Sequence, residues 1–124
     1  MTVLLLLLAC AGAPSPDTAP DLDSADLCAS TGIEGNPADL SGNSNCGEYW
    51  YDALCASCHG ADGLGTDDGP DMRRHVIHHS DLELILVIRG GTGDMPPQPV
   101  DAQQTADLIA HLRNAFGEYD PTAP

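Results

Sequence analysis

The chain has 124 residues and a formal net charge of −15, because 19 Asp and Glu residues face only four Arg and no Lys. Nucleic acids and anionic membrane surfaces bind basic patches, so this composition argues against both as partners. The length allows one small domain with flanking segments. One Trp, three Tyr and one Phe are few aromatic residues for the core of such a domain.

The first nine residues are a short apolar run that ends at Cys10. Nine helical residues span only about 13 Å, far less than the roughly 30 Å hydrocarbon core of a membrane. We therefore predict a signal peptide over residues 1–9. The stretch 7–10, LLAC, resembles the lipobox of bacterial lipoproteins, which implies a lipid on Cys10. The run lacks the usual preceding Lys or Arg, and a plain cleaved signal is the alternative.

Residues 10–41 are predicted to form an acidic tether and loop, because Pro, Ala, Ser and Asp dominate without apolar periodicity. Glycines and a proline continue this irregular character up to the predicted domain boundary. A folded domain is expected over residues 42–118, followed by a short tail at 119–124.

Three helix starts carry a capping side chain with Glu or Gln three residues later, at Asn45, Ser80 and Asp101. The first helix should end near residues 55–57. The second is apolar nearly all round, which indicates burial, and its β-branched run makes a strand the alternative. The third places apolar residues on one face. The stretch 60–79 is rich in Gly and Asp and is predicted to be irregular. Such a long loop in a small domain is unusual unless it wraps something.

The densest chemistry lies in residues 55–59, CASCH. Cys-x-x-Cys-His is the attachment signature of c-type haem: Cys55 and Cys58 would bond the two vinyl groups, and His59 would be the proximal iron ligand. A thioredoxin-like redox pair would need a βαβ context, and a zinc site would need a second ligand pair. A structural pair of free cysteines is the remaining alternative.

Two longer stretches, GEYWYDALCASCHGADGLGTDDGPDM and GGTGDMPPQPVDAQQTADLIAHLRNAF, resemble the class I cytochrome c family over roughly residues 42–117. The resemblance implies a small all-α fold of three to four helices around one covalent haem c. Gly47 and Tyr51 match a family glycine and aromatic, which share a helix face with Cys55 and allow the C-terminal helix to cross closely. His111 stands where the family commonly has Tyr at that crossing.

The same resemblance implies the remaining haem contacts. The Pro70 carbonyl would accept a hydrogen bond from His59 Nδ1, and Met95 would be the distal iron ligand. Met72 is expected to pack against the haem. The alternative distal ligands are the histidines 75, 78 and 79, whose ordinary interpretation is water-exposed loop residues.

Cys28 and Cys46 remain. If Cys10 carries lipid and the haem holds two thiols, these two form an even pair in an oxidising compartment, and a disulfide between them is predicted. Free thiols, or a bridge to an unlipidated Cys10, are the alternatives.

These features predict a single-electron carrier on the periplasmic side of a bacterial membrane, tethered by its lipid, because an iron with both axial positions filled has no open site for substrate. Its redox partners should present cationic surfaces. A haem subunit of a larger oxidoreductase is the alternative, and a ligand sensor or peroxidase is a third hypothesis.

Overall fold

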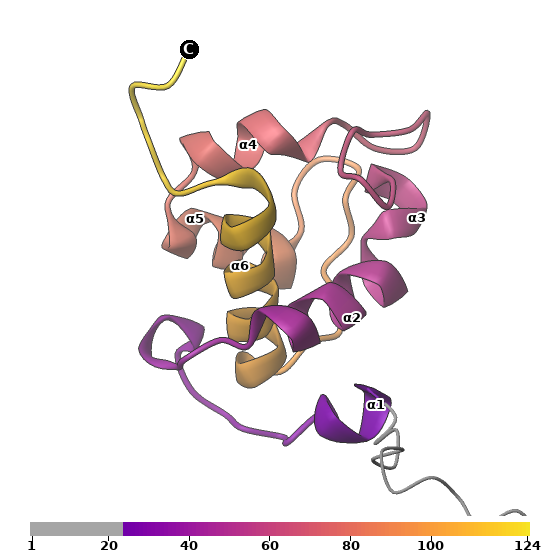
Figure 1. Cartoon of the computed structure of the whole chain (residues 1–124), viewed down its shortest axis with the longest axis vertical. Coiled ribbons are helices and arrows are strands. Elements are labelled where there is room, and N and C mark those ends of the chain that lie inside the picture. The colour runs from indigo at the N-terminus through magenta and orange to yellow at the C-terminus, as the bar shows by residue number, and fades with distance from the viewer. Residues whose placement is uncertain (1–23) are drawn as a thin grey trace, which may run out of the picture.

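The computed structural model describes residues 24–124, so the predicted signal peptide, Cys10 and most of the predicted tether lie outside the described part. The described residues are helical and contain no strand, which confirms the all-α prediction (Figure 1). The elements are α1 (Ser24–Leu27), the 3₁₀ turn η1 (Pro37–Asp39), α2 (Ser44–Leu54), α3 (Ala56–His59), α4 (Met72–His78), α5 (Asp81–Gly90) and α6 (Ala102–Phe116). Within residues 24–124, no helix has the length and apolarity needed to cross a membrane.

The fold is organised by the crossing of α2 and α6 (Figure 1). Gly47 lies at the contact, where a Cβ atom would collide with the backbone carbonyl of Asp107. One turn later, the fully buried Tyr51 ring lies 5.3 Å from the His111 ring. The prediction that Gly47 permits a close crossing through His111 is therefore confirmed.

Side chains from α2, α4, α5 and α6 form one hydrophobic core: Tyr51, Val76, Leu84, Ile85, Ile88, Leu108, Ile109 and Leu112. The prediction that α5 is buried on nearly all sides is wrong. Leu82 and Leu86 keep 59% and 62% of their surface exposed, because α5 packs through one face only. Its polar neighbours at positions 81 and 83 share the solvent side.

Two of the three predicted helix starts are confirmed. Ser80 with Glu83, and Asp101 with Gln104, form complete capping boxes at α5 and α6. The first predicted start is wrong by two residues.

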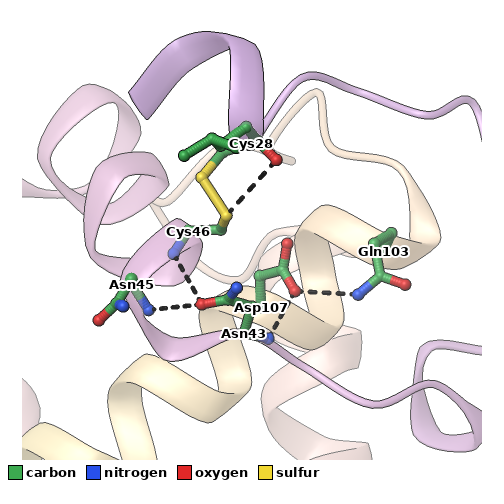
Figure 2. Close-up of a disulfide and its surroundings, with 7 residues drawn as sticks. Cys28, Asn43, Asn45, Cys46, Gln103 and Asp107 are labelled. Carbon is green, nitrogen blue, oxygen red and sulfur yellow. Dashed lines mark hydrogen bonds between the residues drawn. A yellow bond between two sulfur atoms is a disulfide. The ribbon is translucent and has the colours of Figure 1, made fainter. Parts of the chain in front are cut away.

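At that first start the cap is Asn43, whose side chain accepts hydrogen bonds from the N–H groups of Asn45 and Cys46 (Figure 2). The backbone N–H of Asn43 is held by Asp107 Oδ1 at 2.8 Å. This contact from α6 fixes Asn43 in the extended conformation that a cap requires.

Helix α4 lies inside the stretch 60–79 that was predicted to be irregular, so that prediction is wrong for residues 72–78. Seven residues are too few for a clear apolar period. Asp71 caps the helix by accepting from the Arg73 N–H, and Val76 is fully buried in the core. The stability of α4 therefore comes from its cap and from tertiary packing.

Residues 28–43, which we call the N-terminal strap, run from α1 to α2 and are joined to the domain at several points. A disulfide links Cys28 to Cys46 at the start of α2 (Figure 2). The Ser30 hydroxyl and the Gly32 N–H both donate to Asp101 Oδ2. The residues assigned above to a loop thus contact the start of α6.

Candidate functional site

A cavity of about 600 Å³ lies between the end of α2, the short helix α3, the turn before α4 and the loop after α5. It brings together five residues predicted from the sequence: Cys55, Cys58, His59, Pro70 and Met95. The other lining residues are Leu54, Ser57, Asp68, Gly69, His75, Thr92, Asp94, Pro96 and Gln98. The predicted site residues lie between positions 55 and 95 of the sequence and share one cavity in the fold.

His59 is buried at the end of α3, and its Nδ1 atom lies 2.9 Å from the carbonyl oxygen of Pro70. When Nδ1 carries the proton it donates to this carbonyl, and the lone pair of Nε2 is left free. Gly69 makes the close approach possible, because a Cβ there would lie 3.2 Å from Nδ1 and 2.8 Å from the Cys58 carbonyl oxygen. The backbone therefore fixes the orientation of the imidazole.

Two similar turns border the cavity, and their relationship was not predicted from the sequence. In each, a threonine pairs with the residue three positions later, Thr66 with Gly69 and Thr92 with Met95. A proline follows each turn, and an aspartate lies inside it. The repeated pattern Thr-x-Asp-x-Pro was visible in the sequence as TDDGP and TGDMP. One turn positions the carbonyl that faces His59, and the other positions Met95.

The loop that carries Met95 is held tightly. Gly91 has a φ of 73°, and a Cβ at that position would lie 2.7 Å from the Met95 carbonyl oxygen and 2.9 Å from Pro97. Gln98 donates its backbone N–H to the Ile88 carbonyl on α5. Met95 is therefore presented by a backbone with little conformational freedom.

The two cysteines of the motif differ in environment. Cys55 lies at the junction of α2 and α3 and is partly buried, whereas Cys58 is exposed. Burial, together with the neighbouring Cys58, raises the pKa of the Cys55 thiol to about 11. Neither forms a disulfide, and both line the cavity.

The remaining predicted contacts are divided between the cavity and the core. Met72 does not line the cavity; its sulfur lies 3.7 Å from the Tyr51 hydroxyl, which also donates to the Gly60 carbonyl at 2.7 Å. Burial, followed by the nearby Cys55, raises the pKa of Tyr51 to about 12. Of the three alternative histidine ligands, His75 lines the cavity and the other two do not. All three belong to α4 or its C-terminal cap and not to a loop as expected.

Two rival interpretations of the cysteine pair lose support. Within the described residues there is no strand to provide a βαβ unit. No cluster of three or more His, Cys, Asp or Glu side chains among residues 24–124 could hold a metal ion. The thioredoxin-like and zinc interpretations therefore lack their required surroundings.

A haem group fits the residues that are present. The cavity is large, and imidazole and thioether are the axial donors that c-type haem iron takes. Two thiols separated by two residues lie at its edge. A helical fold with this donor set defines the class of c-type cytochromes.

Comparison with known protein families agrees with this assignment to the c-type cytochromes. Residues 43–112 match the family described as cytochrome C oxidase, cbb3-type, subunit III. The chain belongs to this family of c-type cytochrome domains, and it binds haem c covalently. A comparison with curated proteins finds no match.

Solved structures include similar folds. Cytochrome cL from the marine methylotrophic bacterium Methylophaga aminisulfidivorans is 25% identical, with a TM-score of 0.50 over 56% of this chain and 51% of that one. The KustC0563 c-type cytochrome is 24% identical, with a TM-score of 0.50 over 58% of this chain and 98% of that one. Cytochrome cL from Hyphomicrobium denitrificans is 32% identical, with a TM-score of 0.48 over 54% and 44%. The chain thus spans about half the length of the two cytochromes cL.

Proposed function

We propose that the protein is a monohaem electron carrier in which Cys55 and Cys58 form the two thioether bonds and His59 and Met95 are the axial iron ligands. The observation that carries this proposal is the single cavity on which all four side chains meet. The bond between His59 Nδ1 and the Pro70 carbonyl supports it, because it leaves Nε2 free to bind iron.

The haem iron would supply reversible one-electron chemistry, and the chain supplies the ligands and the docking surface. With His59 and Met95 both bound, the iron would have no open coordination position. The constrained Met95 loop would hold the same ligand in both oxidation states and so limit the structural change that accompanies electron transfer. Transfer of single electrons, rather than turnover of a bound substrate, is the activity that this arrangement favours.

The charge of the domain indicates the kind of partner. Residues 47–120 contain 13 Asp and Glu against four Arg. Asp68 and Asp94, one from each of the paired turns, lie on the cavity lining itself. A redox partner with a cationic surface would therefore associate faster at low ionic strength.

The location proposed for this carrier is the periplasmic side of a bacterial membrane, with a lipid on Cys10 as its anchor. The support is the lipobox-like sequence at 7–10 and the predicted acidic tether that follows it. Intact-mass measurement of membrane-extracted protein tests the anchor, because Cys10→Ser should remove both the lipid mass and the membrane fraction.

The ligand assignment is tested with the full chain matured in a periplasm. The oxidised protein should have the weak sulfur-to-iron absorption band, and Met95→Leu should abolish it and allow the reduced protein to bind carbon monoxide. Met72→Leu is the matched control, since Met72 packs in the core and should leave the band intact. A band that survives Met95→Leu, or a colourless protein whose mass lacks the haem, would overturn the proposal.

The exposed pair Leu82 and Leu86 favours a second candidate, a haem subunit fixed in a larger oxidoreductase. Both lie one turn apart on α5, where a permanent partner would cover them. Purification from native membranes distinguishes the two: a free carrier elutes alone, and a subunit elutes with its complex unless Leu82→Ser and Leu86→Ser release it.

A further inference from the structure

The cavity of this acidic protein contains almost no positive charge. Its lining includes the carboxylates of Asp68 and Asp94, and none of the four arginines reaches it. Arg73 is bonded to Asp71, and Arg113 is buried against Asp81. A haem adds two more carboxylates as its propionates, so the loaded site gathers anionic groups that need hydrogen-bond donors.

His75 is the one cavity-lining side chain, apart from the iron ligand His59, that can carry a positive charge. It lies in the middle of α4, and neither ring nitrogen has a hydrogen-bond partner among the described residues. The other donors are weaker candidates. Gln98 already donates to the Pro96 carbonyl, and the buried Trp50 Nε1, although unpartnered among residues 24–124, does not line the cavity.

We propose that the His75 imidazole binds a haem propionate, and that its protonation is coupled to the oxidation state of the iron. The inference goes beyond the proposed axial ligands, because it concerns the edge of the haem and not the iron. A protonated imidazole at a propionate stabilises the carboxylate by a charge-assisted hydrogen bond. The same positive charge disfavours the ferric state, which carries one more positive charge than the ferrous state.

Other titratable groups lie close to His75 or on the same cavity. Asp71 caps α4 four residues before His75, and the His79 ring is 6.0 Å from the His75 ring. Asp68 and Asp94 lie on the cavity lining contributed by the two turns. These groups, together with the haem propionate, are the charged neighbours that the test must consider alongside His75.

The test is the reduction potential of the haem-loaded full chain, measured by spectroelectrochemistry between about pH 5 and pH 8. The wild-type potential should be higher at acid pH and should fall across the titration of His75, with plateaus on both sides. A roughly tenfold change in proton affinity between the oxidation states corresponds to about 59 mV between the plateaus. His75→Asn keeps a donor but does not titrate, and should give a flat profile.

His78→Asn is the matched control, because His78 lies on the same helix outside the cavity lining and should preserve the wild-type step. A flat wild-type profile, or an unchanged step in His75→Asn, would overturn the inference while leaving the sulfur-to-iron band in place. If the wild type lacks that band and His75→Asn gains it, His75 is itself an axial ligand. In that case the inference and the assignment of Met95 would both fail.

Discussion

Gly47 on α2 lies against the backbone carbonyl of Asp107 on α6, and a Cβ at position 47 would also lie only 2.6 Å from the His111 Cβ. Helix α2 ends at Leu54, directly before the first cysteine of the haem motif. The crossing therefore determines where Cys55 lies relative to the rest of the fold.

Gly47→Ala should destabilise the haem-loaded protein by about 3 kcal/mol, because the obstructing atoms are backbone atoms that cannot rotate away. The free energy of unfolding in urea measures this loss. Gly90→Ala is the control, since a Cβ at the end of α5 meets nothing within 4 Å and should cost nothing or stabilise by up to about 1 kcal/mol. Equal stability of Gly47→Ala and the wild type would contradict the role assigned to the crossing.

The disulfide between Cys28 and Cys46 closes a loop with a sequence separation of 18 and holds the N-terminal strap on the domain. On the chain-entropy model, the double variant Cys28→Ser/Cys46→Ser should lower the free energy of unfolding by about 3 kcal/mol. Reduction with dithiothreitol should destabilise the wild type by a similar amount and leave the double variant unchanged. Alkylation of both residues in the unreduced, denatured wild type would show that the bridge is absent.

Arg113 on α6 adds polar links between the end of α4 and the start of α5. Its guanidinium donates to the carbonyls of Val76 and His79, at the end of α4, and to Asp81 Oδ1 at the start of α5. Asp81 is largely exposed, so most of the benefit comes from the two carbonyls.

Arg113→Met should lose about 3 kcal/mol of unfolding free energy, because buried carbonyls are left without donors. Arg113→Lys should lose an intermediate amount of unfolding free energy, because a single ammonium group cannot reproduce the hydrogen-bond geometry of the planar guanidinium. The exposed Arg89→Met serves as the control and should change stability by less than about 0.5 kcal/mol. A loss in Arg89→Met as large as that in Arg113→Met would refute the assignment.

The parts of this protein that could be predicted from the sequence are those encoded locally. The haem motif occupies five consecutive residues, and two capping boxes need only four residues each. The haem motif and each capping box involve residues within about one helical turn, so the spacing of residue types in the sequence is enough to predict them. Gly47 was predicted because the family resemblance supplied the partner helix that the local sequence does not show.

The features that escaped prediction depend on contacts between distant residues. Asn43 and Asn45 are equally good caps in the sequence, and the bond from Asn43 N–H to Asp107, which joins distant residues, favours Asn43. Helix α4 depends on Val76 and Arg113, and no local pattern connects these residues. The exposed face of α5 could not be predicted either, because hydrophobicity does not reveal which side of a helix lacks a neighbour.

His111 carries a pH dependence that follows from its position at the helix crossing. Burial lowers the pKa of His111, although Glu48 and Asp52 oppose the shift. His111 in the folded protein therefore binds a proton less readily than in the unfolded chain, where a histidine takes one up below about pH 6.5. The unfolded state takes up more protons at His111 in this range, so the contribution of His111 to the free energy of unfolding falls as the pH decreases below about 6.5.

His111→Tyr should remove this part of the pH dependence, because a tyrosine does not titrate there, and it should add about 0.5–1 kcal/mol near neutral pH through contact with Tyr51. Tyr is also the residue that the class I cytochrome c family commonly has at this crossing. Urea unfolding of the haem-loaded protein between about pH 5 and pH 7.5 measures both effects. His78→Tyr is the control and should retain the wild-type dependence of unfolding free energy on pH at the acid end of this interval. A variant at position 111 with an unchanged slope would mean that the acid sensitivity of the fold arises from another residue.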